Sequence, residues 1–123
     1  MTKILVVDDE IDVTDFVKHF FEERNKKVFT ALNGSEAVRI VRKEKPDIVL
    51  LDIKMKGMDG IETLKKIRDV DKDVKVIMVT ALHDQEKMDA AEKLGASKYI
   101  TKPLILEELE SVVMRYTKEV KNV

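Results

Sequence analysis

Three aspartates in this sequence directly follow short apolar segments. Residues 4–7 (ILVV) lead into Asp8 and Asp9, and residues 48–51 (IVLL) lead into Asp52. Two carboxylates about 4 Å apart repel each other by roughly 1 kcal/mol in water, and by about 4 kcal/mol at an effective dielectric constant of about 20. A fold that gathers these acids therefore needs a cation. Oxygen ligands without His or Cys favour Mg²⁺ over zinc, so the acids predict a magnesium site.

The chemistry expected beside such a cation is phosphoryl transfer. A carboxylate next to a divalent ion is a competent nucleophile towards phosphorus. Asp52 stands alone and suits that role, whereas the adjacent Asp8 and Asp9 suit metal binding. Thr80 closes the fourth expected strand and Lys102 closes the fifth, just before Pro103, and they could contact phosphate oxygens through a hydroxyl and an ammonium. Any one of these residues alone more often forms a turn or has no function, so the combination carries the argument.

The elements that must position these residues follow from the spacing of apolar side chains, which alternates five times between a short run and a helical period. Strands are expected at residues 4–7, 28–32, 48–51, 74–79 and 98–101. Helices are expected over residues 11–24, around residues 37–41 until Pro46, from Asp59 through Ile67, from about Asp84 to Gly95, and across residues 106–116. Asp59 and Glu62 have the spacing of a capping box, and the Lys102–Pro103 bond is a candidate for the cis form.

Strict alternation of strand and helix predicts an α/β fold with helices on both faces of a parallel sheet. The first, third and fourth strands are the most apolar of the five and are expected at the centre, whereas the second and fifth are more mixed and are expected at the edges. The prediction is a flavodoxin-like, doubly wound (βα)5 three-layer sandwich with strand order 2-1-3-4-5 and right-handed crossovers. In such sheets ligands bind beyond the carboxyl ends of the strands, where the order reverses. That point lies between the first and third strands, which both lead into aspartate.

Composition narrows the class of protein. The 123 residues fit a single domain spanning 1–123. The 23 Lys and Arg nearly balance 24 Asp and Glu, and the net charge of −1 gives no reason to expect direct nucleic-acid or membrane binding. No apolar stretch approaches the roughly 20 residues of a membrane span. There are no cysteines, and a cytoplasmic location is expected.

Five segments together resemble the response-regulator receiver family, the CheY-like domains of two-component signalling. They are residues 4–10 (ILVVDDE), 46–52 (PDIVLLD), 57–60 (GMDG), 80–81 (TA) and 102–103 (KP). They run through nearly the whole chain in the family's order and spacing. The resemblance implies a Mg²⁺ site formed by Asp8, Asp9, Asp52 and the backbone carbonyl of Lys54, with Asp9 favoured as a direct ligand.

The resemblance also implies a phosphorylation mechanism and a switch. Asp52 would become a 4-aspartylphosphate, and Thr80 and Lys102 would bind the phosphate. Tyr99 matches the family's aromatic switch residue, although its position also suits an ordinary amphipathic edge-strand residue. The surface expected to change is formed by the fourth strand, the fourth helix and the fifth strand, from about Asp84 to Tyr99. Such a domain is a phosphoacceptor that promotes only its own phosphorylation and dephosphorylation, not a conventional enzyme.

The partners implied are a sensor histidine kinase or phosphotransfer protein as phosphodonor, and a downstream protein or output domain as target. A small acyl phosphate is an alternative donor. A monomer or a weak phosphorylation-dependent dimer is expected. The chain is either a complete single-domain regulator or a receiver from a longer protein, and the final helix, without a clear linker after it, favours the former.

Several positions depart from the family's commonest pattern or tune it. Lys56 replaces the Pro usual before Gly57, which predicts a more mobile loop, and Leu104 stands where Phe is usual. Lys54 and Leu82, two residues after Asp52 and Thr80 respectively, match positions that tune the lifetime of the phosphate.

Three other functions fit these residues less well. A phosphatase of the haloacid dehalogenase kind requires an Asp-x-Asp motif, whereas Asp8 and Asp9 are adjacent. A flavodoxin-like flavin or nucleotide binder requires a phosphate cradle rich in Gly, Ser and Thr after the first strand, where this chain has acids. A receiver-shaped module that is never phosphorylated is disfavoured by the intact set of acids, Thr and Lys, and a phosphorylation assay separates it from the receiver hypothesis.

Overall fold

One parallel sheet forms the middle layer of the protein. The structure is a computed structural model that describes residues 1–81 and 85–121. The strands of these residues are β1 (Lys3–Val7), β2 (Lys27–Ala31), β3 (Ile48–Asp52), β4 (Lys75–Thr80) and β5 (Lys98–Thr101). Their order is β2-β1-β3-β4-β5, and every pair is parallel. The predicted topology is confirmed.

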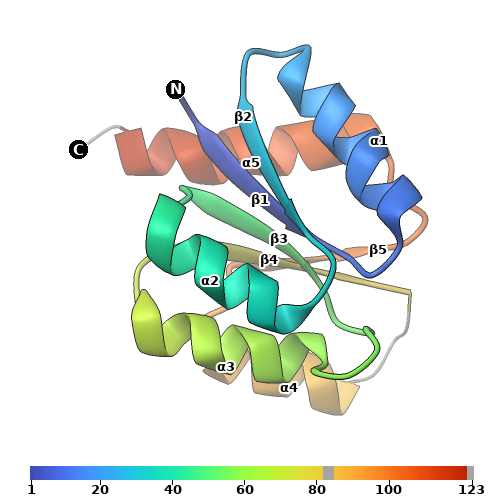
Figure 1. The fold of residues 1–123 in the computed structure, drawn as a ribbon, viewed down its shortest axis with the longest axis vertical. Coiled ribbons are helices and arrows are strands. Elements are labelled where there is room, and N and C mark those ends of the chain that lie inside the picture. The colour runs from blue at the N-terminus through green and yellow to red at the C-terminus, as the bar shows by residue number, and fades with distance from the viewer. Residues whose placement is uncertain (82–84, 122–123) are drawn as a thin grey trace.

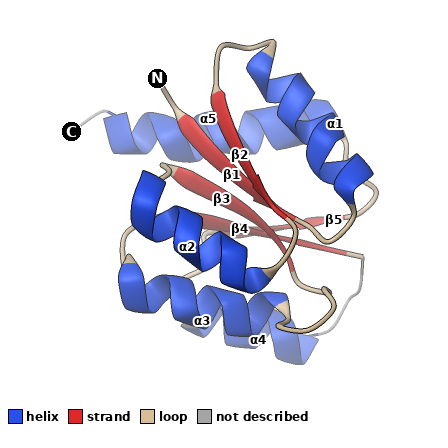
Figure 2. Ribbon diagram, viewed as in Figure 1, coloured by secondary structure: helices blue, strands red, loops and turns tan. Residues whose placement is uncertain are grey.

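Helices cover both faces of the sheet. They are α1 (Ile11–Glu22), α2 (Gly34–Glu44), α3 (Gly60–Val70), α4 (Gln85–Lys93) and α5 (Leu106–Lys121). Figure 1 shows α1 and α5 on one face and α2, α3 and α4 on the other, and Figure 2 shows the strands between these two layers. The predicted three-layer sandwich is therefore confirmed. None of the described helices is long and apolar enough to cross a membrane.

The core is divided by the central strands into two apolar clusters. Successive residues of a strand point to opposite faces, so Leu5 and Met78 pack towards α2, α3 and α4, while Ile4 and Ile77 pack towards α1 and α5. All residues of β3 are buried, whereas β2 and β5 have a mixed burial pattern. The placement of the apolar strands at the centre is confirmed.

Side chains that accept backbone N–H hydrogen bonds set where two of the helices begin. α2 begins at Gly34 because the Asn33 side chain accepts the Glu36 N–H at 2.9 Å, which is earlier than the apolar pattern alone indicated. Asp59 caps α3 in the same way, by accepting the Glu62 N–H at 2.9 Å. A capping box has two hydrogen bonds, and the structure shows the one in which the Asp59 side chain accepts the Glu62 N–H.

The C-terminal end of α4 is held by an arginine from α3. The Arg68 guanidinium donates to the carbonyls of Leu94 at 2.9 Å, Gly95 at 2.8 Å and Val74 at 2.6 Å. Gly95 has a φ of 81°, which suits the left-handed turn expected to end this helix. The sequence marked the Gly95 turn but gave no sign of the Arg68 contacts. The Lys102–Pro103 peptide bond is cis.

Candidate functional site

Asp8 and Asp52 lie side by side at the carboxyl end of the sheet. Asp52 is the last residue of β3, and Asp8 follows Val7, which pairs with Leu51 in the register between β1 and β3. Neighbouring strands are about 4.8 Å apart, so the topology alone forces the two carboxylates together. Both are buried, with exposed fractions of 3% for Asp8 and 5% for Asp52. The structure thus brings these acids together where the strand order reverses.

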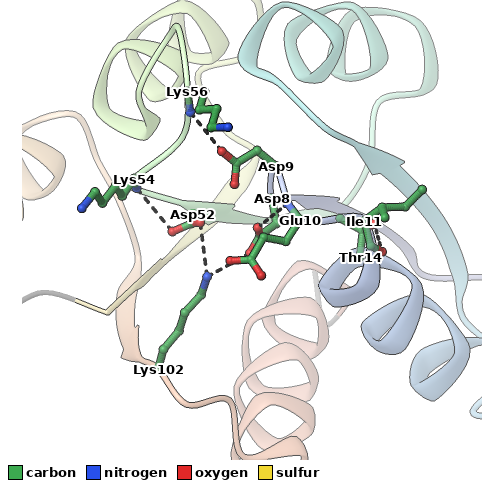
Figure 3. A network of polar contacts seen from close by, with 9 residues as sticks. All are labelled: Asp8, Asp9, Glu10, Ile11, Thr14, Asp52, Lys54, Lys56 and Lys102. Carbon is green, nitrogen blue, oxygen red and sulfur yellow. Dashed lines mark hydrogen bonds and ion pairs between the residues drawn. The ribbon is translucent and has the colours of Figure 1, made fainter.

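Lys102 reaches this pair from beyond β5. Its Nζ donates to Asp8 Oδ2 at 3.0 Å and to Asp52 Oδ2 at 3.3 Å, so a single ammonium bridges the two carboxylates (Figure 3). The Lys102 backbone N–H donates to the Thr80 carbonyl at 2.8 Å, which continues the pairing of β4 with β5. Pairing with β4 thus fixes the backbone of Lys102, and its side chain extends past the end of β4 to reach Asp52 at the end of β3.

Backbone amides hold the other sides of the acids. Each of the three aspartates accepts one N–H hydrogen bond from a loop at this end of the sheet (Figure 3). The pairs are Glu10 to Asp8 at 3.0 Å, Lys54 to Asp52 at 3.3 Å and Lys56 to Asp9 at 3.0 Å. Such bonds fix the rotation of a carboxylate and satisfy lone pairs that burial would otherwise leave without a partner.

Neighbouring charges shift the pKa values of both Asp52 and Lys102. Burial raises the pKa of Asp52, and the charge of Asp8 raises it further, while Lys102 and the Lys54 N–H oppose the shift. Burial by itself lowers the pKa of Lys102, but the hydrogen bonds and charges of Asp8 and Asp52 outweigh burial and raise it. The ammonium is thus firmly protonated, yet it does not fully compensate the acids around it.

The donor set fits a hard divalent cation. Oxygens of Asp8, Asp9 and Glu10 all lie within 4.8 Å of one another, and Asp52 is joined to Asp8 through Lys102. The carboxylates gathered here outnumber the single ammonium of Lys102, and a divalent ion would offset the remaining negative charge. The side-chain donors are all carboxylate oxygens, as Mg²⁺ prefers. Glu10 was not among the predicted ligands, although it continues the acidic run that ends the first strand.

Thr80 and Tyr99 lie on the same face of the sheet. Thr80 is the last residue of β4 and is 2% exposed. It lies two residues after Met78, so the two side chains point to the same face of the sheet. Met78 pairs with Tyr99 in the register between β4 and β5. The Tyr99 ring packs at the edge of the cluster beneath α4, and its hydroxyl donates to the Met88 carbonyl in that helix. The two predicted switch residues are therefore both on the side of the sheet that α4 covers.

Two of the predicted roles, those of the Lys54 carbonyl and of Leu82, stay predictions. Lys54 takes part in the site through its N–H group, and metal binding by its carbonyl stays a prediction. Leu82, expected to tune the lifetime of the phosphate, lies outside the described residues. Lys56, which the sequence marked only as a replacement for Pro, contributes a hydrogen bond to Asp9 that Pro could not make.

Comparisons with known proteins identify the family of the chain. The family model for the response regulator receiver domain matches residues 4–114. The chain is 39% identical over 114 residues to sporulation initiation phosphotransferase F of Bacillus subtilis (strain 168), covering 93% of this chain and 92% of that protein.

Solved structures of receiver domains have the same fold as this chain. A CheY-like receiver domain protein from Methanospirillum hungatei JF-1 superimposes with a TM-score of 0.94 at 29% identity, covering 97% of this chain and 95% of the other. A two-component response regulator from Clostridium difficile gives a TM-score of 0.93 at 30% identity, with 100% of each chain covered. The chain therefore belongs to the response regulator receiver domain family.

Proposed function

We propose that this chain is a phosphoacceptor whose Asp52 receives a phosphoryl group in a Mg²⁺-dependent reaction. The observation that carries the proposal is the bridge from the Lys102 ammonium to the buried carboxylates of Asp8 and Asp52. A structural ion pair needs one acid for each base. Two buried acids around one lysine, with a third acid beside them, form instead a site that is incomplete without further positive charge.

The reaction follows from what each side chain can do. One Asp52 oxygen forms a bond to phosphorus while the bond between phosphorus and the donor breaks. The electron pair of the broken bond leaves with the donor. Mg²⁺, held by Asp8, Asp9, Asp52 and the Lys54 carbonyl, would neutralise charge on the phosphoryl oxygens. Lys102 adds a second positive charge to those oxygens.

The remaining predicted roles belong to the same proposal. Thr80 donates its hydroxyl to the phosphate, and Lys54 and Leu82 flank the phosphate and tune its lifetime. The donor is a phosphohistidine of a sensor kinase or phosphotransfer protein, or a small acyl phosphate. The relative in Bacillus subtilis is itself named a phosphotransferase, which supports this class of partner.

The signal leaves through α4 and β5. Phosphorylation adds negative charge and strong acceptor oxygens at the end of β3. Thr80 and Tyr99 share the face covered by α4, and the Tyr99 hydroxyl is bonded to the Met88 carbonyl of that helix. A phosphate that draws Thr80 towards it would favour a second state in which Tyr99 turns inward and this hydrogen bond breaks. A downstream protein or output domain would read the change.

The proposal is tested by phosphorylation in solution. The purified protein is incubated with acetyl phosphate and Mg²⁺, and intact mass is measured alongside Asp52→Asn. As a matched control we choose Asp15→Asn, because Asp15 is an exposed acid on α1. We expect one phosphoryl group on the wild type and on the control, none on Asp52→Asn, and none after chelation of Mg²⁺.

A phosphate mimic separates a poor donor from a wrong function. Beryllofluoride with Mg²⁺ should raise the melting temperature of the wild type and leave that of Asp52→Asn unchanged. Absence of both the adduct and this shift would favour a receiver-shaped module that acts without phosphorylation.

A further inference from the structure

The loop between β3 and α3 reaches back to the end of β1 through a single backbone amide. The Lys56 N–H donates to Asp9 Oδ2 at 3.0 Å, across 47 residues of sequence (Figure 3). The side chain of Lys56 is exposed, so the contact depends on the amide rather than on the ammonium. Proline, which resembling chains commonly have before Gly57, lacks this donor.

The oxygens of Asp9 are used differently from those of its neighbours. Asp8 and Asp52 each have one oxygen bonded to a backbone N–H and the other to Lys102. Asp9 has one oxygen bonded to Lys56, and within residues 1–81 and 85–121 its second oxygen accepts no hydrogen bond. Figure 3 shows that second oxygen on the side of the carboxylate facing Asp8 and Asp52. It is the oxygen placed to receive a cation.

We propose that Lys56 is a positioning residue, whose backbone N–H holds the Asp9 carboxylate with its second oxygen turned towards the magnesium site. The inference rests on the proposed function. A carboxylate rotates freely about its last bond unless one oxygen is anchored, and hydrogen bonds to metal ligands commonly change metal affinity by about 10–100-fold. The Lys56 amide supplies that anchor, and its side chain is dispensable.

The same loop also holds Asp52. The Lys54 N–H donates to Asp52 Oδ1 at 3.3 Å, so amides two residues apart hold acids from β3 and from the end of β1. A cation bound by both acids therefore finds their relative orientation already set by one short loop. Removing the Lys56 donor leaves Asp52 anchored and lets Asp9 rotate.

The matched variants are Lys56→Ala and Lys56→Pro. Both remove the Lys56 ammonium, but only the proline removes the N–H. The dissociation constant for Mg²⁺ is measured by calorimetry without any phosphodonor. We expect Lys56→Ala to bind within about twofold of the wild type, and Lys56→Pro to bind about tenfold more weakly than Lys56→Ala. Melting in the presence of a chelator checks that both variants are folded.

A second measurement needs no proline variant. Amide exchange of Lys56 is followed by NMR in the metal-free wild type and in Asp9→Ala, where protection of this amide should be lost. Addition of Mg²⁺ to the wild type should leave the amide protected, because the bond persists in the metal-bound state. Faster exchange on adding Mg²⁺ would instead mean that the bond holds Asp9 away from the cation and would overturn the proposal.

Equal affinities of the alanine and proline variants would likewise refute it, as would tighter binding by Lys56→Pro. A wild type that binds no Mg²⁺ while its Lys56 amide stays protected would refute the proposed function together with this inference. Weaker binding by Lys56→Pro in a protein that still binds Mg²⁺ but accepts no phosphoryl group would support the positioning role and remove only the phosphoacceptor proposal.

Discussion

At the scale of single residues, the charge of Asp52 opposes folding when no cation is present. The side chain is 5% exposed, and burial and the nearby Asp8 raise its pKa. We expect Asp52→Asn, measured by urea denaturation with a chelator near neutral pH, to raise the free energy of unfolding by about 1–2 kcal/mol. Asparagine keeps an acceptor for the Lys54 N–H but removes the repulsion by Asp8.

The pH dependence of this gain has a definite sign. Because the pKa of Asp52 is higher in the folded than in the unfolded chain, the cost of its charge is fully present above the folded-state pKa. It declines as the pH falls through that value and is gone below the unfolded-state pKa. The stabilisation by Asp52→Asn should therefore shrink in acid, and the exposed control Asp15→Asn should show no comparable gain. A gain that grows in acid would contradict the assigned cause.

At the scale of elements, α3 begins so close to β3 that a side chain cannot fit at its first residue. A Cβ at Gly60 would lie 2.2 Å from the Asp52 carbonyl oxygen and 2.5 Å from Ile53 Cα, and the Gly60 N–H donates to the Ile53 carbonyl at 2.7 Å. We expect Gly60→Ala to lower the free energy of unfolding by about 2–3 kcal/mol, because backbone atoms must move apart. Denaturation in urea measures the loss.

Gly57 is the matched control for that loss. It lies in the loop just before α3 with a φ of 78°, and a Cβ there would meet nothing within 4 Å. Gly57→Ala should therefore cost only the strain of a left-handed alanine, about 1 kcal/mol. A loss at Gly57 equal to that at Gly60 would show that conformational strain, and not the approach of α3 to β3, dominates in this loop.

At the scale of the whole molecule, stability is expected to be distributed unevenly. The central strands are almost completely buried, whereas Ala91 is the buried residue of α4. Native-state hydrogen exchange should therefore be slowest in β1, β3 and β4, and fastest among the helices in α4.

Arg68→Ala, which removes the hydrogen bonds to the end of α4, should accelerate exchange of α4 selectively. Arg115→Ala, an exposed change on α5, should not. Uniform acceleration by Arg68→Ala would mean that α4 opens only with the whole domain.

The sequence by itself determined the topology and the main participants of the site. Apolar runs and helical periods are local signals, and few topologies join five such units with right-handed crossovers. Once strand order is known, residues at the ends of adjacent strands must meet, so Asp8 and Asp52 could be placed together without a structure. Tyr99 was harder, because a half-buried edge position suits both an ordinary aromatic residue and a switch.

Only the tertiary structure decided the contacts made by backbone groups and by long side chains. The Lys56 amide meets Asp9 because of the φ and ψ angles of a loop, which residue types constrain only weakly. Arg68 has the sequence pattern of a solvated helix residue, yet its guanidinium donates to the carbonyls of Leu94 and Gly95, just after the end of α4. Periodicity locates faces and strand ends, whereas the direction of an N–H group or a guanidinium depends on neighbours distant in the chain.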